Sequence, residues 1–261
     1  MRLGCCIAGQ DQLAPLGGQA DYCELPVARA LMQSDAAFEA LAARLEDSPV
    51  PARACNVFLP AHLKVVGPAV DGAALRAYVE AALDRMRRIG ARVLVVGSAG
   101  ARDVPEGFDR ERALDQFAGF LRDVAERGAG RGVTVVLEPL RPQETNLLNT
   151  VAESASFLRE RDTGRARLLA DLYHMREQGE PMDSLAACAD LLEHVHVAGV
   201  ERGRPAPDTA DLEPFLRALR GAGYAGDCSI ECRWTDFAAE APGALQHLRA
   251  VARQAGWEGP A

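Results

Sequence analysis

Four side chains that could bind a metal ion stand at the ends of four successive apolar segments in the second half of the chain. The segments VVLE, LLAD, HVHVA and SIE present Glu138, Asp171, His196 and Glu231. Three carboxylates and one imidazole are mostly hard oxygen donors, and this set suits Mn²⁺, Mg²⁺ or a similar octahedral ion. Co²⁺ and Zn²⁺ remain alternatives, although a structural zinc site would be expected to use thiolates or several histidines.

The spacing of these residues predicts one shared site rather than four separate ones. An acidic residue at a strand end is often only a solvated loop residue or the cap of the next helix. In an α/β barrel, however, the carboxyl ends of the strands surround the active site. Four metal-binding side chains at corresponding strand positions are therefore expected to converge on one ion.

The hydrophobic pattern alternates between short apolar runs and longer stretches with helical spacing, which is typical of alternating β and α units. Several runs are rich in Val, Ile and Leu without polar alternation, as expected for parallel strands covered on both faces. The eight predicted strands span residues 2–8, 21–25, 53–59, 92–98, 133–138, 167–171, 193–198 and 228–232.

Amphipathic stripes lie between these strands and predict helices. Gly90 and Gly128 would follow two of the stripes, and Thr150 with Glu153 would form a capping box at the start of another helix. The stripes are Phe38, Leu41 and Leu45; Leu75, Val79, Leu83 and Met86; Leu114, Phe117, Leu121 and Val124; and Leu212, Phe215, Leu216 and Leu219.

Eight βα units in 261 residues predict a single (β/α)₈ TIM barrel, a fold that needs about 250 residues. An open doubly wound sheet is the competing topology. Because the chain shows no linker, low-complexity tract or internal repeat, residues 1–261 are predicted to form one domain.

Composition excludes several classes of function. A net charge of −8 argues against nucleic acid and anionic membranes as partners. The chain has no apolar run of membrane-spanning length, and the apolar start LGCCIAG stops at Gln10, so we expect neither a membrane segment nor a signal peptide. Seven cysteines without a CxxC pair suggest reduced core thiols and a cytoplasmic protein.

The sequence gives no support for a nucleotide-binding enzyme or a serine hydrolase. GAGYAG (221–226) matches the dinucleotide pattern GxGxxG, but it follows a helical stripe and precedes a strand, which is the wrong order for that fingerprint. The sequence contains no GxSxG elbow and no phosphate-binding P-loop.

Further polar residues are predicted near the same end of the barrel. His174 lies three residues after Asp171, whereas His194, two residues from His196 on one strand face, is interpreted as a hydrogen-bonded layer residue. Arg202 could hold a substrate oxygen. The loop after Glu138 adds Glu144 and Asn146, and the glycine-rich GSAGAR (97–102) would let a ligand approach the backbone.

The ordered motifs VVLEPLRPQETNLLNT (135–150), DLYHM (171–175), HVHVA (194–198), GYAG (223–226) and SIE (229–231) resemble the xylose isomerase-like TIM barrel family. The resemblance runs from about residue 53 to 235. Within the family it is nearest to the sugar epimerase and isomerase branch, which includes D-tagatose 3-epimerase and hydroxypyruvate isomerase.

This resemblance implies specific roles. Glu138, Asp171, His196 and Glu231 match the metal ligands, and the two glutamates also match the catalytic acid/base pair. His174, Arg202 and Glu144 match substrate-contacting positions. The implied enzyme epimerises or isomerises a keto-sugar or keto-polyol, with one divalent ion, most plausibly Mn²⁺, stabilising an enediolate.

Three other functions are weighed against this one. The same enediolate could expel a substituent, as in a lyase or dehydratase acting on a keto-sugar or keto-glycoside. The apurinic endonuclease branch of the superfold would need a histidine-rich zinc cluster, whereas this chain has five histidines and is acidic. A non-catalytic sugar-binding barrel is the third. The expected partner is a small carbohydrate, and a homo-oligomer is compatible with the sequence.

Overall fold

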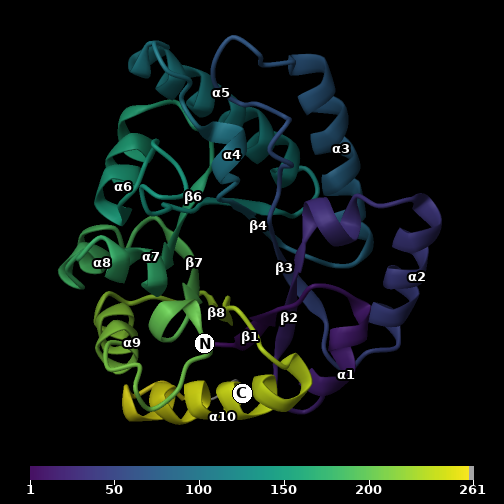
Figure 1. Cartoon of the computed structure of the whole chain (residues 1–261), viewed down its shortest axis with the longest axis vertical. Coiled ribbons are helices and arrows are strands. Elements are labelled where there is room, and N and C mark those ends of the chain that lie inside the picture. The colour runs from purple at the N-terminus through teal and green to yellow at the C-terminus, as the bar shows by residue number, and fades with distance from the viewer. Residues whose placement is uncertain (259–261) are drawn as a thin grey trace.

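The computed structural model describes residues 1–258, which form a closed barrel of eight parallel strands in sequential order (Figure 1). The predicted (β/α)₈ TIM barrel is confirmed, and the open-sheet alternative is wrong because the last strand pairs with the first. The strands are β1 (Leu3–Cys6), β2 (Tyr22–Pro26), β3 (Ala52–Asn56), β4 (Val93–Val96), β5 (Thr134–Leu137), β6 (Arg167–Asp171), β7 (Leu192–Val197) and β8 (Asp227–Ile230).

Helices surround the barrel on its outer side (Figure 1). The helices and short helical turns are η1 (Gln10–Gln12), α1 (Leu13–Leu16), η2 (Val27–Leu31), α2 (Asp35–Glu46), α3 (Gly72–Arg88), α4 (Ala99–Arg102), α5 (Arg110–Ala129), α6 (Val151–Glu160), α7 (Leu172–Glu177), α8 (Asp183–Ala187), η3 (Val200–Arg202), α9 (Leu212–Gly221) and α10 (Phe237–Gln254).

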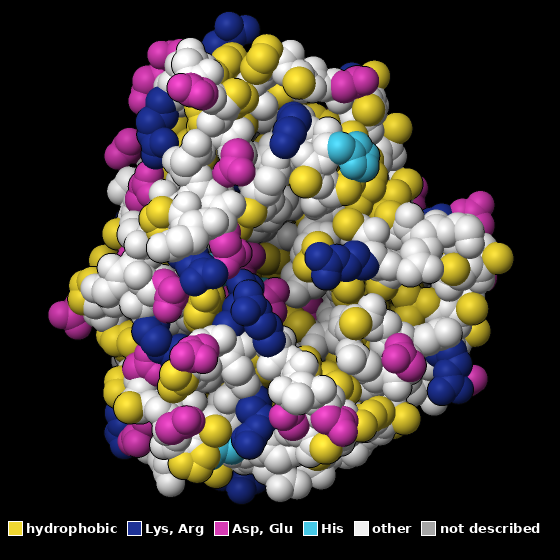
Figure 2. Space-filling model, viewed as in Figure 1, with side chains coloured by type: hydrophobic (Ala, Val, Ile, Leu, Met, Phe, Trp, Pro, Cys, Tyr) yellow, Lys and Arg dark blue, Asp and Glu magenta, His cyan; other side chains and the backbone are white. Residues whose placement is uncertain are grey.

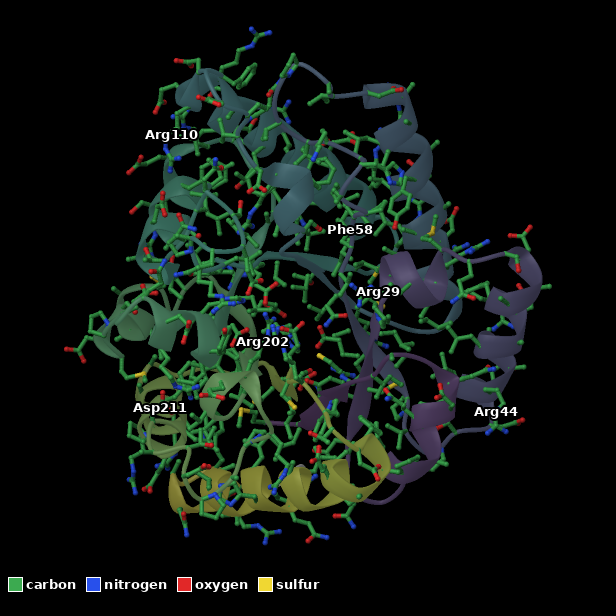
Figure 3. The ribbon with its side chains drawn as sticks, viewed as in Figure 1. Arg29, Arg44, Phe58, Arg110, Arg202 and Asp211 are labelled. Atoms are coloured by element: carbon green, nitrogen blue, oxygen red, sulfur yellow. The ribbon has the colours of Figure 1, made fainter. Side chains whose placement is uncertain are left out.

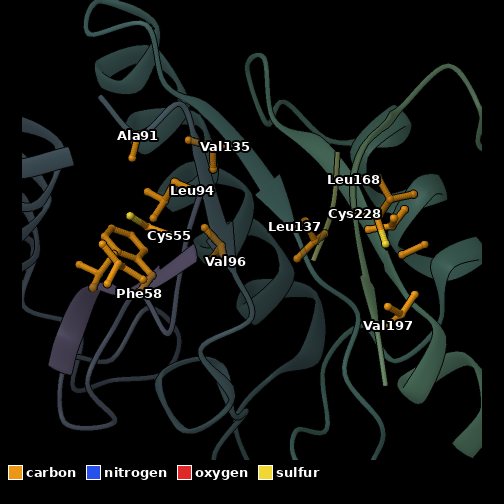
Figure 4. Packing of buried hydrophobic residues seen from close by; sticks show 14 of the residues in the cluster. Cys55, Phe58, Ala91, Leu94, Val96, Val135, Leu137, Leu168, Val197 and Cys228 are labelled. Atoms are coloured by element: carbon orange, nitrogen blue, oxygen red, sulfur yellow. The ribbon is translucent and has the colours of Figure 1, made fainter. Parts of the chain in front are cut away.

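The predicted stripes face the barrel. Every residue in the four stripes is buried except Leu114, which is half-buried. The stripes belong to one large cluster of buried hydrophobic residues. Figure 4 shows part of this cluster, where Leu94 and Val96 of β4 lie near Cys55 of β3 and Phe58. Val95, Val136 and Leu169 form a smaller cluster that is separate from the large one.

Helix ends follow the predicted signals with two differences. The Thr150 hydroxyl accepts from the backbone N–H of Glu153 at 3.0 Å, but the Glu153 carboxylate accepts from the N–H of Asn149 rather than from that of Thr150.

Gly90 follows α3 with a φ of +76°, as a terminating glycine should. Gly128 instead lies inside α5, where a Cβ would come within 2.8 Å of the Val133 carbonyl oxygen. Gly128 is therefore a site of close packing.

Two expectations concern cysteines and membranes. All seven cysteines are free, and most of them are buried. Among residues 1–258, no helix is both long and apolar enough to cross a bilayer. The predicted domain end at residue 261 lies outside the described residues.

Alternation along the strands decides which side chains enter the barrel. Because strand side chains alternate between faces, Val136 shares a face with Glu138, and Leu169 shares one with Asp171. The apolar residue of each pair fills the barrel interior, and the acidic residue two positions later lies above it. The same alternation brings His194 and His196 to one side of β7.

We predict that Gly4→Ala will destabilise the barrel. A Cβ at Gly4 would collide with the ring of Tyr22, which is fully buried and fixed by a 2.7 Å hydrogen bond to Ser229. Such overpacking costs about 1–3 kcal/mol, which urea denaturation can measure. Gly72→Ala is the matched control, since within residues 1–258 its added Cβ would meet no atom within 4 Å beyond its chain neighbours and its own helix backbone, and Ala favours a helix. Equal effects of the two substitutions would contradict this packing.

Candidate metal centre

The four predicted ligands meet at one end of the barrel. Glu138 follows β5, Asp171 ends β6, His196 lies near the end of β7 and Glu231 follows β8. Each offers one ligand atom, and these atoms all lie within 4.8 Å of one another. Glu138, Asp171 and His196 are buried, whereas Glu231 is partly exposed. The structure therefore assembles the side chains that the sequence placed on separate strands.

The Asp171 carboxylate has one satisfied oxygen and one unsatisfied oxygen. Its Oδ1 accepts a 2.8 Å hydrogen bond from the backbone N–H of Tyr173, which caps α7. Among the described residues, its buried Oδ2 has no hydrogen-bond partner, and the nearby Nε2 of His174, 3.7 Å away, has none either. Buried polar atoms normally have partners, so Oδ2 is available to a group bound within the cluster.

The hydrogen bonds of His196 determine which ring nitrogen faces the cluster. Its Nε2 lies 3.0 Å from Oε1 of Glu24. Its Nδ1 lies 3.2 Å from Oε1 of Glu138 and 3.8 Å from Oε2 of Glu231. Burial lowers the pKa of His196, but Glu24, Glu231 and Glu138 outweigh it and hold that pKa well above its usual value. A cation bound in the cluster would therefore replace the proton on Nδ1, while Nε2–H stays on Glu24.

Glu24 is a buried carboxylate that the sequence analysis missed. Its Oε2 lies 2.9 Å from Nε2 of His194 and accepts a 2.7 Å hydrogen bond from the Ser229 hydroxyl. Burial opposes ionisation, but His196 and His194 outweigh it and hold the pKa of Glu24 far below its usual value. The predicted layer role of His194 agrees with this contact. The signal in the sequence was an acidic residue inside the otherwise apolar run YCELP.

Gly97 makes room for Glu138. A Cβ at this position would collide with Oε2 of Glu138, so only glycine leaves space for that carboxylate. The buried guanidinium of Arg102 also holds this residue, because it donates a 2.9 Å hydrogen bond to the Glu138 backbone carbonyl. The glycine-rich segment 97–102, which was expected to let a bound molecule approach its backbone, thus also supports Glu138, a candidate metal ligand.

The environments of the two glutamates shift their pKa values in opposite directions. Burial, together with the charge of Glu231, raises the pKa of Glu138. Burial also acts on Glu231, but the charges of His196 and Arg202 outweigh it and lower the pKa of Glu231. Burial and Glu231 raise the pKa of Asp171 to about 6. A divalent cation bound among these groups would relieve the repulsion between the carboxylates.

Arg202 lies over the cluster and is anchored at both ends of its guanidinium. It donates to Oε2 of Glu231 at 2.8 Å and to Oε1 of Glu144 at 3.0 Å, and it stacks on the ring of Tyr173. Glu201 and Arg202 both have positive φ values, 53° and 61°, which non-glycine residues adopt only under external restraint. The predicted site residues Arg202 and Glu144 therefore contact each other.

Three further polar residues lie next to the candidate metal centre or in the loops beside it. His174 is buried beside Asp171, and its Nδ1 accepts from the backbone N–H of Arg141 at 3.2 Å. Asn146 instead hydrogen-bonds both backbone groups of Val104 and so ties two loops together. Asn56, which the sequence did not indicate, donates a 2.9 Å hydrogen bond to Oε1 of Glu231.

A cavity of about 540 Å³ opens onto the cluster at the mouth of the barrel. Glu138, Glu144, Arg202 and Glu231 line one side of it. Figure 2 shows the hollow with basic and acidic side chains around its rim, and Figure 3 places Arg202 and Arg29 on opposite sides of the opening. A small polar molecule can therefore reach the carboxylates from solvent.

A model of the xylose isomerase-like TIM barrel family matches residues 11–254. The chain belongs to this family. The match extends beyond the segment from 53 to 235 that carried the resemblance, and it includes β2 and its Glu24.

Two relatives illustrate the similarity in sequence. The chain is 28% identical to 3-dehydro-D-guloside 4-epimerase of Escherichia coli strain K12 over 164 residues, covering 59% of this chain and 62% of the relative. It is 32% identical to L-ribulose 3-epimerase of Methylomonas sp. strain DH-1 over 128 residues, covering 49% and 44%. Each match thus spans less than two thirds of the relative's length.

Solved structures share the fold over almost the whole chain. A crystal structure of D-psicose 3-epimerase in the presence of D-fructose has a TM-score of 0.84 at 17% identity, covering 97% of this chain and 99% of the other. The apo form of 3-keto-D-glucoside 4-epimerase from E. coli has a TM-score of 0.79 at 22% identity, covering 96% and 99%. At these identities the comparison establishes the barrel fold.

We predict that Glu24→Gln will weaken binding of Mn²⁺ by about 10–100-fold, the usual effect of removing the hydrogen-bond partner of a metal-binding histidine. The amide cannot accept from His194, His196 and Ser229 together, so the orientation of His196 is lost. Isothermal titration of the metal-free protein measures the affinity. Glu160→Gln, a change at an exposed position on α6, should bind Mn²⁺ like the unaltered protein. Unchanged affinity in Glu24→Gln would refute this role.

Proposed function

We propose that the protein is a divalent-metal-dependent epimerase or isomerase of a keto-sugar or related keto-polyol. The observation that carries the proposal is the compact cluster of Glu138, Asp171, His196 and Glu231, in which the two glutamates come from opposite ends of the strand series β5 to β8. Two carboxyl groups beside one bound substrate are suited to take and return a proton. The family membership and the epimerase names of the relatives agree with this chemistry.

The residues present fit a single metal ion. Glu138, Asp171, His196 through Nδ1, and Glu231 would hold it, and the unpartnered Oδ2 of Asp171 supports that assignment. The oxygen-rich donor set favours Mn²⁺ over Co²⁺ or Zn²⁺, with Mg²⁺ as a close alternative. When bound, the ion supplies positive charge that stabilises the enediolate formed when a proton leaves the carbon beside the carbonyl.

The side chains of this protein perform the proton transfers. One of the two glutamates removes the proton from the carbon beside the carbonyl. If the other glutamate returns a proton to the same carbon on the opposite face, the product is an epimer. Return to the neighbouring carbon yields the aldose–ketose isomer. Arg202, held by Glu144, lines the cavity and would donate to an oxygen atom of the substrate. Nε2 of the buried His174, which has no partner within residues 1–258, would be a second donor.

The proposal also includes the setting in which the enzyme works. We infer one domain over residues 1–261, acting on a small carbohydrate in the cytoplasm, where the seven free thiols would stay reduced. A homo-oligomer is compatible with this activity.

We predict that Glu231→Gln and Glu138→Gln will each slow proton exchange by about 10²–10⁴-fold, the usual contribution of a general acid or base. The Mn²⁺-loaded enzyme is incubated in D₂O with a panel of ketoses and keto-polyols, and NMR follows deuterium entering the carbon beside the carbonyl.

Glu39→Gln, at an exposed position on α2, serves as the control and should exchange at the original rate. The configuration of the product separates epimerase from isomerase, and loss of a substituent would identify a lyase. Metal binding without exchange across the panel would contradict the proposal.

A further inference from the structure

The cavity extends well beyond the candidate metal ligands. One side is formed by Glu138, Leu140, Glu144, Arg202 and Glu231, from the segments after or at the ends of β5, β7 and β8. The opposite side, which we call the β2–β4 wall, comes from the segments after β2, β3 and β4. The wall consists of Ala28, Arg29, Val57, Leu59, Pro60, Ala61, Ser98, Ala99 and Gly100.

The size of the cavity leaves room beyond a reacting carbonyl and its neighbouring hydroxyl. Its volume of about 540 Å³ lies in the range that encloses drug-sized ligands, about 300–1,000 Å³. A free pentose or hexose is smaller than such a ligand. The wall contains no aromatic side chain, and its alanines and Gly100 keep the opening wide. A substrate centred on the cluster can therefore carry a substituent toward the wall.

Charge is unevenly distributed across this cavity. The three lining carboxylates all lie on the metal side and have basic partners: His196 for Glu138, and Arg202 for both Glu144 and Glu231. On the wall, Arg29 is the single charged residue. Within residues 1–258 its guanidinium forms no hydrogen bond or ion pair, since only its backbone carbonyl is used, by Gln33.

A second basic group, Lys64, binds the backbone of the wall without lining the cavity. The Lys64 ammonium donates a 2.6 Å hydrogen bond to the carbonyl of Gly100, which lines the cavity. Ser98 accepts from the N–H of Leu59 at 3.1 Å, so its hydroxyl hydrogen is free to donate. Donors and positive charge thus lie on the side of the cavity away from the carboxylates.

We propose that the substrate carries an anionic group, a carboxylate or a phosphate, at the end away from its reacting carbonyl, and that Arg29 binds this group. The inference rests on the proposed function, because it takes the metal cluster as the reacting end. A guanidinium offers paired donors that match the oxygens of a carboxylate or phosphate. Arg29 is exposed, so solvent and salt screen part of this attraction.

The test compares three ketoses that differ at one terminus: D-fructose, D-fructuronate and D-fructose 6-phosphate. Isothermal titration measures their binding to the Mn²⁺-supplemented protein. We expect at least one anionic sugar to bind about tenfold or more tightly than D-fructose, equivalent to about 1.4 kcal/mol. Which of the two binds better distinguishes carboxylate from phosphate.

Arg29→Gln should abolish most of this preference, because the amide keeps a donor but loses the charge. Arg44→Gln, on α2 away from the cavity, should retain it. Equal binding of neutral and anionic sugars, no binding of any of them, or an equal loss for all three in Arg29→Gln would overturn the inference. Proton exchange in the same samples reports on the proposed function separately, since an anionic preference without exchange would refute only the reaction.

Discussion

The barrel closes around four carboxylates, Glu24, Glu138, Asp171 and Glu231, and their charges must be compensated by groups from distant parts of the chain. An unpaired buried carboxylate would cost several kcal/mol or lose its charge. His196 is the centre of this compensation, because its two ring nitrogens face Glu24 on one side and Glu138 on the other. The orientation of that ring therefore couples the interior of the barrel to the candidate metal centre.

The compensation of charge is incomplete at the candidate metal centre. Glu24 is fully matched by two histidines and Ser229, and its pKa is lowered. Glu138 and Asp171 have raised pKa values because burial and Glu231 dominate there. A divalent cation in contact with both would complete the balance of charge. The same region carries other strained or tightly restricted features, namely the positive φ values at Arg202 and the collision that Gly97 avoids.

The fold and the four candidate ligands were predictable because both depend on short-range pattern. Apolar runs mark the strands, and a carboxylate or histidine at each strand's carboxyl end must point to the same mouth once the barrel closes. Glu24 was missed because its partners, His194 and His196, are separated from it by 170 or more residues, and only the closed barrel brings them together. The position of Arg29 at the cavity was equally hidden, since it depends on the irregular η2 turn after β2.

The most direct measurement is anomalous scattering from crystals of the Mn²⁺-loaded protein, recorded on both sides of the manganese absorption edge. Our account predicts one strong peak in contact with Glu138, Asp171, Glu231 and Nδ1 of His196, while Nε2 of His196 stays bonded to Glu24. A peak at Cys6 and Glu24, the other group of side chains in residues 1–258 that could hold an ion with His196, would contradict the assignment. The absence of any ordered peak at saturating Mn²⁺ would contradict it as well.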